Sequence, residues 1–288
     1  MPKGFRVFGF LYYIITAAVS FVISNLHSNN INNFAYLSAI LLVMCLVLFC
    51  YLLKYKKPLF KNQKINHQLY TVLKNIDSIA IDGIGDEKTW NNSSWLPINQ
   101  LWLGKPIDSS DFSGRYKLSW SDDALYVLAE IKDDILMDKI KNPLERWWDD
   151  DCVEIFIDED NSGGNHQFNH NAFAYHIGLN GDVVDLDSID SPRLFNNHIV
   201  SKKTMIKKDT YVWEFKISLY PDTYSFDGDQ TALKLKSKKK IGFAIAYCDN
   251  DRSKFRENFI GSVFVKGDNK NKGWIDADIF GTISLKSK

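Results

Sequence analysis

The sequence has no excess charge of either sign, because its 288 residues include 35 lysine and arginine side chains and 35 aspartate and glutamate side chains. Proteins that bind nucleic acid carry a basic patch or stripe, which attracts the phosphate backbone. The even balance therefore predicts a protein with no nucleic-acid partner.

Cysteine is scarce, and the 4 cysteines form no CxxC motif and no cysteine–histidine cluster with zinc spacing. Cys45 and Cys50 lie in an apolar run, which leaves Cys152 and Cys248 for the rest of the chain. A disulfide between these two is an open alternative, but we predict two buried free thiols. No redox cofactor is expected.

Charged residues are missing from two stretches, residues 7–26 and 34–53, each about 20 residues long. A helix of that length crosses ~30 Å of hydrocarbon. Both stretches are apolar on every side, which argues against a pair of amphipathic core helices. With the short polar connector at residues 27–33, they predict a membrane protein with a transmembrane α-hairpin. A signal peptide is the alternative for the first stretch.

Amphipathic helices are almost absent after the apolar stretches, and residues 134–140 are the best short candidate. Apolar residues instead alternate with a period of two between clusters of Gly, Asp, Asn and Ser, which is typical of short strands. The predicted strands are residues 115–120, 125–132, 152–158, 173–179, 198–204, 211–219, 241–249 and 279–285. Without helices between the strands a parallel α/β sheet is excluded, so we predict an all-β protein with an antiparallel, jelly-roll-like β-sandwich.

These patterns divide the chain into three parts. Residues 1–57 are predicted to be the membrane-anchoring helical hairpin, and the basic and polar residues 58–77 a juxtamembrane linker. Residues 78–288 are predicted to form the β-sandwich.

Aromatic residues are abundant, with 8 Trp, 13 Tyr and 19 Phe, and they suit both a β-rich core and contact with the flat C–H face of a sugar ring. Three of the predicted strands carry bulky apolar residues on one face and small residues, with Glu154 and His176, on the other. Such a small-residue face predicts a shallow trough with a polar floor. A second layer of protein over the same face is the equal alternative.

Five segments, in order along the chain, resemble the family 9 carbohydrate-binding modules that are attached to xylanases. They are residues 81–90 (IDGIGDEKTW), 120–128 (WSDDALYVL), 148–161 (WDDDCVEIFIDEDN), 174–177 (AYHI) and 274–281 (WIDADIFG). The resemblance covers the chain from about residue 79 to 285. It implies a β-sandwich without catalytic activity, structural calcium ions and a sugar slot between two tryptophans.

By this resemblance Trp148 and Trp274 form the two walls of the slot, and Glu154 accepts hydrogen bonds from sugar hydroxyls. Asn271 stands where the family has a hydrogen-bonding asparagine, and His176 stands where it often has an arginine. Trp147 should point away from Trp148, into the core.

Two departures from the family pattern leave the identity of the sugar open. They are His176 and Ala246, which stands where the family can have a glutamine. Tyr247, Asp249 and Arg256 are candidates for the missing contact.

Acidic residues and glycines crowd together at residues 158–164, which resembles a calcium loop. We predict Asp158 and Asp160 as metal ligands, with a solvated acidic turn as the alternative. The loop lacks the glutamate that closes an EF-hand.

The resemblance implies a non-enzymatic protein that binds oligo- or polysaccharide, of cello or xylo type, in the setting of polysaccharide catabolism. Asp150 and Glu154 lie roughly 13 Å apart along one strand, which is too far for the ~5–10 Å of a glycosidase pair. The alternatives are a haem-binding electron-transfer sandwich with Met137 and His176 as ligands, and a sensory or structural ectodomain with a degenerate slot.

The basic residues beside the apolar hairpin predict a membrane orientation that conflicts with carbohydrate binding. Basic residues flank both ends of the apolar hairpin, from Lys3 to Arg6 and from Lys54 to Lys64, so the positive-inside rule places both ends in the cytoplasm. Carbohydrate capture favours the extracytoplasmic side instead. The sequence therefore leaves both sides of the membrane open.

Overall fold

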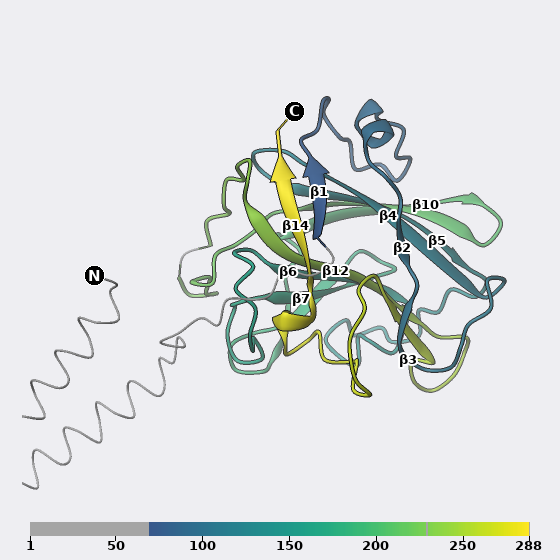
Figure 1. Cartoon of the computed structure of the whole chain (residues 1–288). Helices are drawn as coiled ribbons and strands as arrows, with labels where there is room; N and C mark the ends of the chain where they lie inside the picture. The colour runs from purple at the N-terminus through teal and green to yellow at the C-terminus, as the bar shows by residue number, and fades with distance from the viewer. Residues whose placement is uncertain (1–68, 229, 288) are drawn as a thin grey trace, which may run out of the picture. The chain divides into compact units, whose positions relative to one another are not determined.

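The structure is a computed structural model and describes residues 69–287 apart from residue 229 (Figure 1). Fourteen strands and two short 3-10 helices make up this part of the chain. The strands are β1 (Leu69–Leu73), β2 (Leu96–Ile98), β3 (Gln100–Leu103), β4 (Phe112–Trp120), β5 (Leu125–Asp133), β6 (Cys152–Asp158), β7 (Phe173–Gly178), β8 (Val183–Leu186), β9 (Pro192–Leu194), β10 (Ile199–Lys207), β11 (Thr210–Ile217), β12 (Lys240–Asp249), β13 (Asn258–Gly261) and β14 (Gly281–Lys286); the helices are η1 (Lys88–Asn92) and η2 (Ala277–Ile279).

The strands form two sheets, which confirms the predicted all-β sandwich. The larger sheet has the order β1-β14-β12-β6-β7-β8-β9, and β13 joins β12 to β3 beside it. The smaller sheet has the order β10-β11-β5-β4-β2. All pairs are antiparallel except β1 with β14, which lie side by side in the same direction (Figure 1).

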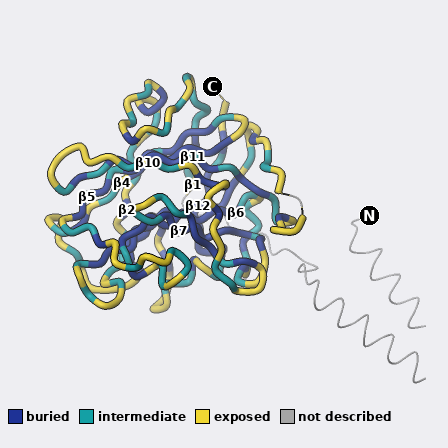
Figure 2. Tube along the Cα trace, turned by 180° about the vertical axis from the view of Figure 1, so that it is seen from behind, coloured by how far each residue is buried: buried dark blue, intermediate teal, exposed yellow. Residues whose placement is uncertain are grey.

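The main core lies where the inner faces of the two sheets meet. The bulky residues of the alternating strands point into it, such as Ile155 of β6, Tyr175 of β7 and Ile245 of β12 from the larger sheet. Trp213 and Phe215 of β11 enter from the smaller sheet. The central strands of the tube in Figure 2 are accordingly buried. Period-two alternation therefore indicated the inner faces of these strands correctly.

A second apolar layer covers much of the opposite face of the larger sheet. Ala244 and Ala246 of β12 and Phe156 of β6 are buried there beneath Trp102 of β3 and Phe280. Close packing sets the choice of small residues, because bulky side chains would hold this layer off the sheet. The sequence analysis offered a covering layer or an open trough for this face, and each describes part of it. The layer covers the small residues, while Glu154 and His176 lie beside a cavity.

Two local predictions are wrong. Residues 134–140 form no helix, because aspartate side chains take their backbone N–H groups: Asp151 Oδ2 accepts from Met137 N and Asp150 Oδ2 accepts from Ile140 N. Residues 69–73, placed in the linker by the sequence, form β1 and pair with β14 over five residues. Their mixed polar composition conceals a strand because β1 lies at the edge of its sheet.

The predicted localisation in a membrane, with two transmembrane helices, is corrected by the structure. In residues 69–287, residue 229 excepted, no helix has the length and apolar character that a bilayer crossing needs. The two apolar stretches that led to the prediction, residues 7–26 and 34–53, lie outside the described residues.

The two cysteines of the sandwich are buried free thiols, as predicted. Cys152 of β6 and Cys248 of β12 are register partners on neighbouring antiparallel strands. Both side chains lie on the face of the sheet that also carries Glu154.

Candidate functional site

The five residues predicted to bind a ligand line one cavity of about 410 Å³. Glu154 comes from β6 and His176 from the neighbouring β7, where they are register partners. Trp148 lies in the turn before β6, and Asn271 and Trp274 lie in the segment before η2. The full lining is Trp147, Trp148, Glu154, His176, Asp185, Leu186, Asp190, Pro192, Arg256, Asn271 and Trp274.

The two predicted wall tryptophans are partly open to solvent. Trp148 is 37% exposed and Trp274 is 39% exposed, whereas Trp120 and Trp213 of the core are 1% and 2% exposed. An indole that stays open beside a cavity presents a large apolar face that a ligand can cover. This exposure separates the cavity tryptophans from those that only fill the core.

Trp147 also lines the cavity, which corrects the prediction that it belongs to the core. Its ring meets Trp148 edge to face at 4.8 Å and His176 at 6.1 Å. The prediction assumed strand alternation, but residues 142–150 form turns, where neighbouring side chains need not point to opposite faces.

Glu154 forms the floor of the cavity and is 2% exposed. Its Oε1 atom accepts hydrogen bonds from Cys248 Sγ at 3.0 Å and Arg256 Nη1 at 3.1 Å, and it forms an ion pair with His176 Nε2 at 2.8 Å. Within residues 69–287, no side chain or backbone group donates a hydrogen bond to the other oxygen, Oε2. Glu154 thus keeps one acceptor oxygen for a ligand.

The surroundings keep Glu154 charged despite its burial. Burial alone would raise the pKa of its carboxyl group, but the charges of His176 and Arg256 and the hydrogen bonds to them outweigh it and hold the pKa below its usual value. Both ring nitrogens of His176 face acceptors, since Nδ1 lies 3.1 Å from Ala174 O. The ring of His176 is therefore held between the Glu154 carboxylate and the backbone.

Arg256 also lines the cavity, whereas the sequence indicated it only as one of three candidates for the missing contact. It follows β12, its side chain is 8% exposed, and it reaches Glu154 and Cys248 through Nη1. Tyr247, another candidate, points into the main core and donates to Asp133. Only the family resemblance indicated that a contact is missing here. The loop that carries Arg256 shows no hydrophobic periodicity that could have identified it.

One side of the cavity comes from β8 and the loop after it, which the sequence did not indicate. Asp185 contributes from this side, and its two carboxylate oxygens accept from the backbone N–H groups of Ala174 and Leu186. Burial raises the pKa of Asp185 to about 7. Leu186, Asp190 and Pro192 complete this side.

The haem alternative finds no support in the geometry. Met137 and His176 border a separate pocket of about 50 Å³, far smaller than a macrocycle. His176 already uses both ring nitrogens, as described above.

The predicted calcium loop at residues 158–164 is closed by its own hydrogen bonds. Asp158 accepts from Ser162 N and Gly163 N, and Asp160 accepts from Ser162 N. Asn161 and Gly163 adopt positive φ angles of 52° and 68°, which make the turn tight. These hydrogen bonds describe an acidic turn, and the assignment of Asp158 and Asp160 as metal ligands stays a prediction.

The fold and the cavity together define a β-sandwich binding module, with open indoles and a buried carboxylate at its site. The sequence model of the family described as "Carbohydrate family 9 binding domain-like" matches residues 81–288. The chain therefore belongs to this family of carbohydrate-binding modules.

Individual relatives agree with the family assignment. Endo-1,4-beta-xylanase C of Paenibacillus barcinonensis is 25% identical over 209 residues, which are 73% of this chain and 16% of the relative. Endo-1,4-beta-xylanase A of Thermotoga maritima is 37% identical over 82 residues, which are 28% of this chain and 7% of the relative. The chain thus spans only a small part of the length of these enzymes.

A solved structure shows the same fold. The family 9 module from Caldicellulosiruptor kristjanssonii in complex with cellotriose superposes with a TM-score of 0.55 at 24% identity, over 76% of this chain and 95% of that module. A putative carbohydrate-binding protein from Bacteroides uniformis gives a TM-score of 0.50 at 11% identity, over 76% of this chain. Both likenesses concern the fold.

Proposed function

We propose that the domain binds an oligosaccharide of cello or xylo type in the cavity between Trp148 and Trp274, and that it breaks no bond in the sugar. The observation that carries the proposal is the pairing of two half-open indoles with the free Oε2 of Glu154 in one cavity. A β-linked sugar offers the complement, with apolar C–H faces and hydroxyl groups around the ring edge.

Each side chain has a distinct task in this proposal. The indoles of Trp148 and Trp274 cover the C–H faces and remove them from water. Glu154 Oε2 accepts from a sugar hydroxyl, and a charged acceptor makes a stronger hydrogen bond than a neutral one. Asn271 offers an amide at the same cavity. His176 and Arg256 position Glu154 through its other oxygen.

The carboxylates of the cavity are poorly arranged for hydrolysis. A glycosidase needs one carboxyl group that gives a proton and one that acts as base or nucleophile. Both oxygens of Asp185 accept hydrogen bonds from backbone N–H groups, and Oε1 of Glu154 is bound to His176 and Arg256. Asp150 accepts from Ile140 N and does not line the cavity. These contacts favour binding without catalysis.

Calorimetry of the full chain with cellotriose and xylotriose tests the proposal. We expect Trp148→Ala and Trp274→Ala each to weaken binding by about tenfold or more, because each removes an apolar face worth on the order of 1.4 kcal/mol. Phe168→Ala is the matched control, since Phe168 is an exposed aromatic residue outside the cavity. Equal affinities in all three variants and the natural sequence would contradict the proposed site.

A further inference from the structure

The proposed sugar cavity carries more carboxylates than cations. Glu154, Asp185 and Asp190 line it, together with one arginine, Arg256, and one histidine, His176. No described lysine is among the lining residues. Burial raises the pKa of Asp185 to about 7, so this carboxylate becomes charged over the neutral range. The indole walls favour positive charge as well, because the face of an aromatic ring attracts a cation. The cavity thus fits a positively charged ligand better than a negatively charged one.

The two basic side chains of the cavity contact the same oxygen atom. Arg256 Nη1 lies 3.1 Å from Glu154 Oε1, and His176 Nε2 lies 2.8 Å from it. The side chain of Arg256 is only 8% exposed, and its Nε atom is buried. The other oxygen of Glu154, Oε2, receives no hydrogen bond from a described group. A ligand at Oε2 therefore meets a carboxylate oxygen that neither basic group contacts.

Asp190 is an exposed carboxylate at the cavity, and it forms no ion pair with a described lysine, arginine or histidine. The loop from β8 to β9 fixes its position. Asp187 Oδ1 accepts from the backbone N–H groups of Ile189 and Ser191 at 2.9 and 3.0 Å, and Asp190 N donates to Asp187 O at 3.0 Å. Asp190 adopts a positive φ angle of 63°, which aspartate tolerates better than most residues. The loop therefore holds an unpaired negative charge at the cavity.

Basic residues next to the cavity in sequence are paired with aspartates of their own. Arg193 of β9 follows the loop, and its Nε lies 3.0 Å from Asp187 Oδ2. Lys272 follows Asn271 of the cavity, and its Nζ lies 3.0 Å from Asp276 Oδ2. These pairs are neutral as a whole, so they do not compensate the carboxylates that line the cavity.

A smaller neighbouring pocket extends the acidic surface. It has a volume of about 50 Å³ and shares Trp147 and His176 with the cavity. No described lysine or arginine lines it, and its acidic lining residues are Asp138, Glu145, Asp150, Asp151 and Asp182. Burial raises the pKa of Asp151 to about 9, so this residue adds no charge at neutral pH. A ligand that reaches past Trp147 therefore stays among carboxylates.

We propose that the cavity prefers β-1,4-linked sugars that carry ammonium groups, of the glucosamine type, over the uncharged cello form. Glucosamine oligomers share the ring shape and linkage of cello-oligosaccharides, and an ammonium group replaces one hydroxyl on the edge of each ring. The C–H faces still fit the two indoles, while the ammonium group donates to Glu154 Oε2 and is attracted by Asp190. Hydrogen bonds between an ammonium group and a carboxylate are charge-assisted and stronger than those of a hydroxyl. This inference rests on the proposed function, because it names the class of sugar for the same site.

Calorimetry of the full chain with the glucosamine trimer, the N-acetylglucosamine trimer and cellotriose tests the preference. At a pH of about 6.5 the amino groups are protonated. We expect the glucosamine trimer to bind about fivefold or more tightly than cellotriose, because it forms the charge-assisted hydrogen bonds. The N-acetylglucosamine trimer has the same skeleton without the charge and should lack this gain. A rise in NaCl from about 50 mM to about 500 mM should weaken binding of the glucosamine trimer by about threefold and leave cellotriose binding unchanged.

The substitution Asp190→Asn removes one negative charge and keeps the shape of the loop, since asparagine also tolerates a positive φ angle. We expect the ratio of the glucosamine-trimer affinity to the cellotriose affinity to fall about threefold in this variant. Asp268→Asn changes an exposed residue outside the cavity, so it is the matched control and should keep the ratio of the natural sequence. Equal ratios in the two variants would overturn the role of Asp190.

The outcomes separate this inference from the proposed function. Equal affinities for the glucosamine trimer and cellotriose would overturn the preference and leave the proposed function intact. Glucosamine-trimer binding that Trp148→Ala does not weaken would also overturn it, because the ammonium groups would then bind acidic surface outside the cavity. If none of the three trimers binds, the proposed function and the preference both fall.

Discussion

Glu154 is the residue on which the proposed site depends most. It carries a buried charge that contacts Arg256 and His176, and removal of one member of such a group leaves the others uncompensated. The contacts of Glu154 have two effects. They fix the carboxylate through Oε1, and they leave Oε2 for a ligand. Stability and binding should therefore respond together to a change at this position.

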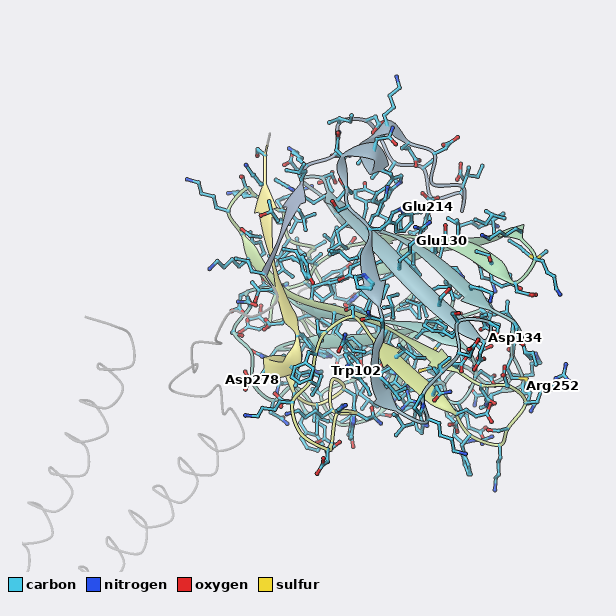
Figure 3. All side chains as sticks on the ribbon, turned by 45° about the vertical axis from the view of Figure 1, so that its right-hand side comes forward. Trp102, Glu130, Asp134, Glu214, Arg252 and Asp278 are labelled. Atoms are coloured by element: carbon cyan, nitrogen blue, oxygen red, sulfur yellow. The ribbon has the colours of Figure 1, made fainter. Side chains whose placement is uncertain are left out.

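The substitution Glu154→Gln separates the charge from the shape. We expect the free energy of unfolding to fall by about 2 kcal/mol and cellotriose binding to weaken by about tenfold, because a neutral amide is the poorer acceptor and leaves buried His176 and Arg256 unpaired. Urea denaturation and calorimetry measure the two effects. Glu130→Gln is the control (Glu130 is labelled in Figure 3). The side chains of Glu130 and its partner Arg115 are 25% and 47% exposed, so the change should stay under about 1 kcal/mol. Equal losses in the two variants would refute the structural role of Glu154.

At the residue scale the resemblance indicated which positions gather at the cavity better than strand patterns did. Trp148, Glu154 and Trp274 were assigned by matching segments, and the fold brings all three to one cavity. The prediction that Trp147 lies in the core assumed strand alternation. It is wrong, because alternation requires a strand and β6 begins only at Cys152. Arg256 reaches the site through a loop whose course depends on side-chain contacts far apart in sequence, which no local pattern contains.

At the scale of elements, long central strands were predictable and short edge strands were not. The prediction for residues 152–158 coincides with β6, since its inner face carries an unbroken series of β-branched residues. The three-residue strands β2 and β9 carry too few side chains for a period to show. Each contains a proline, which is tolerated at such edges.

β13 provides a test of the layer that covers the larger sheet. A Cβ atom on Gly261 would lie 2.1 Å from the Trp102 ring, so glycine is what allows β3 and β13 to pack this closely. We expect Gly261→Ala to lower the free energy of unfolding by about 1–3 kcal/mol through overpacking. Gly228→Ala is the control, because its nearest contact is 3.3 Å away in an exposed turn, and should change stability by less than about 0.5 kcal/mol. Urea denaturation of both variants makes the comparison, and equal midpoints would mean that Trp102 is free to move aside.

At the scale of the whole molecule, buried titratable groups make stability depend on pH. Burial lowers the pKa of His166 to about 4 and of His198 to about 3, and it also lowers the pKa of His170. Asp185 acts in the opposite direction, because burial raises its pKa to about 7. A carboxyl group with a raised pKa stabilises the folded state at low pH and loses that effect as the pH rises through about 7.

Of His166 and His198, His198 has the lower pKa and the less exposed side chain. Its Nδ1 faces Tyr175 Oη at 2.8 Å, its ring stacks on Tyr220 at 3.8 Å, and its Nε2 is buried without a partner in the described chain. The other titratable groups packed on it are Tyr224 and, through a Coulomb interaction, His170. None of these neighbours is an anion at neutral pH, so nothing there compensates an imidazolium.

The sign of the effect follows from proton binding in the two states. In the unfolded chain His198 binds a proton below a pH of about 6.5, whereas in the folded chain it stays neutral down to about 3. Its contribution to stability is complete above pH 6.5 and is lost as the pH falls below it. At pH 5 the loss is about 2 kcal/mol for this one group relative to pH 8.

Denaturation by urea at pH 8 and pH 5 measures this loss, with His198→Phe as the variant that cannot bind the proton. We expect the natural sequence to lose about 2 kcal/mol more than His198→Phe between the two pH values. His166→Gln offers the same comparison at a second site if the phenyl ring disturbs the aromatic cluster, because the hydrogen bonds of the His166 ring go to backbone groups such as Gly273 O. An identical pH dependence in the natural sequence and both variants would mean that these histidines take up protons in the folded state, which requires water to enter the core around them.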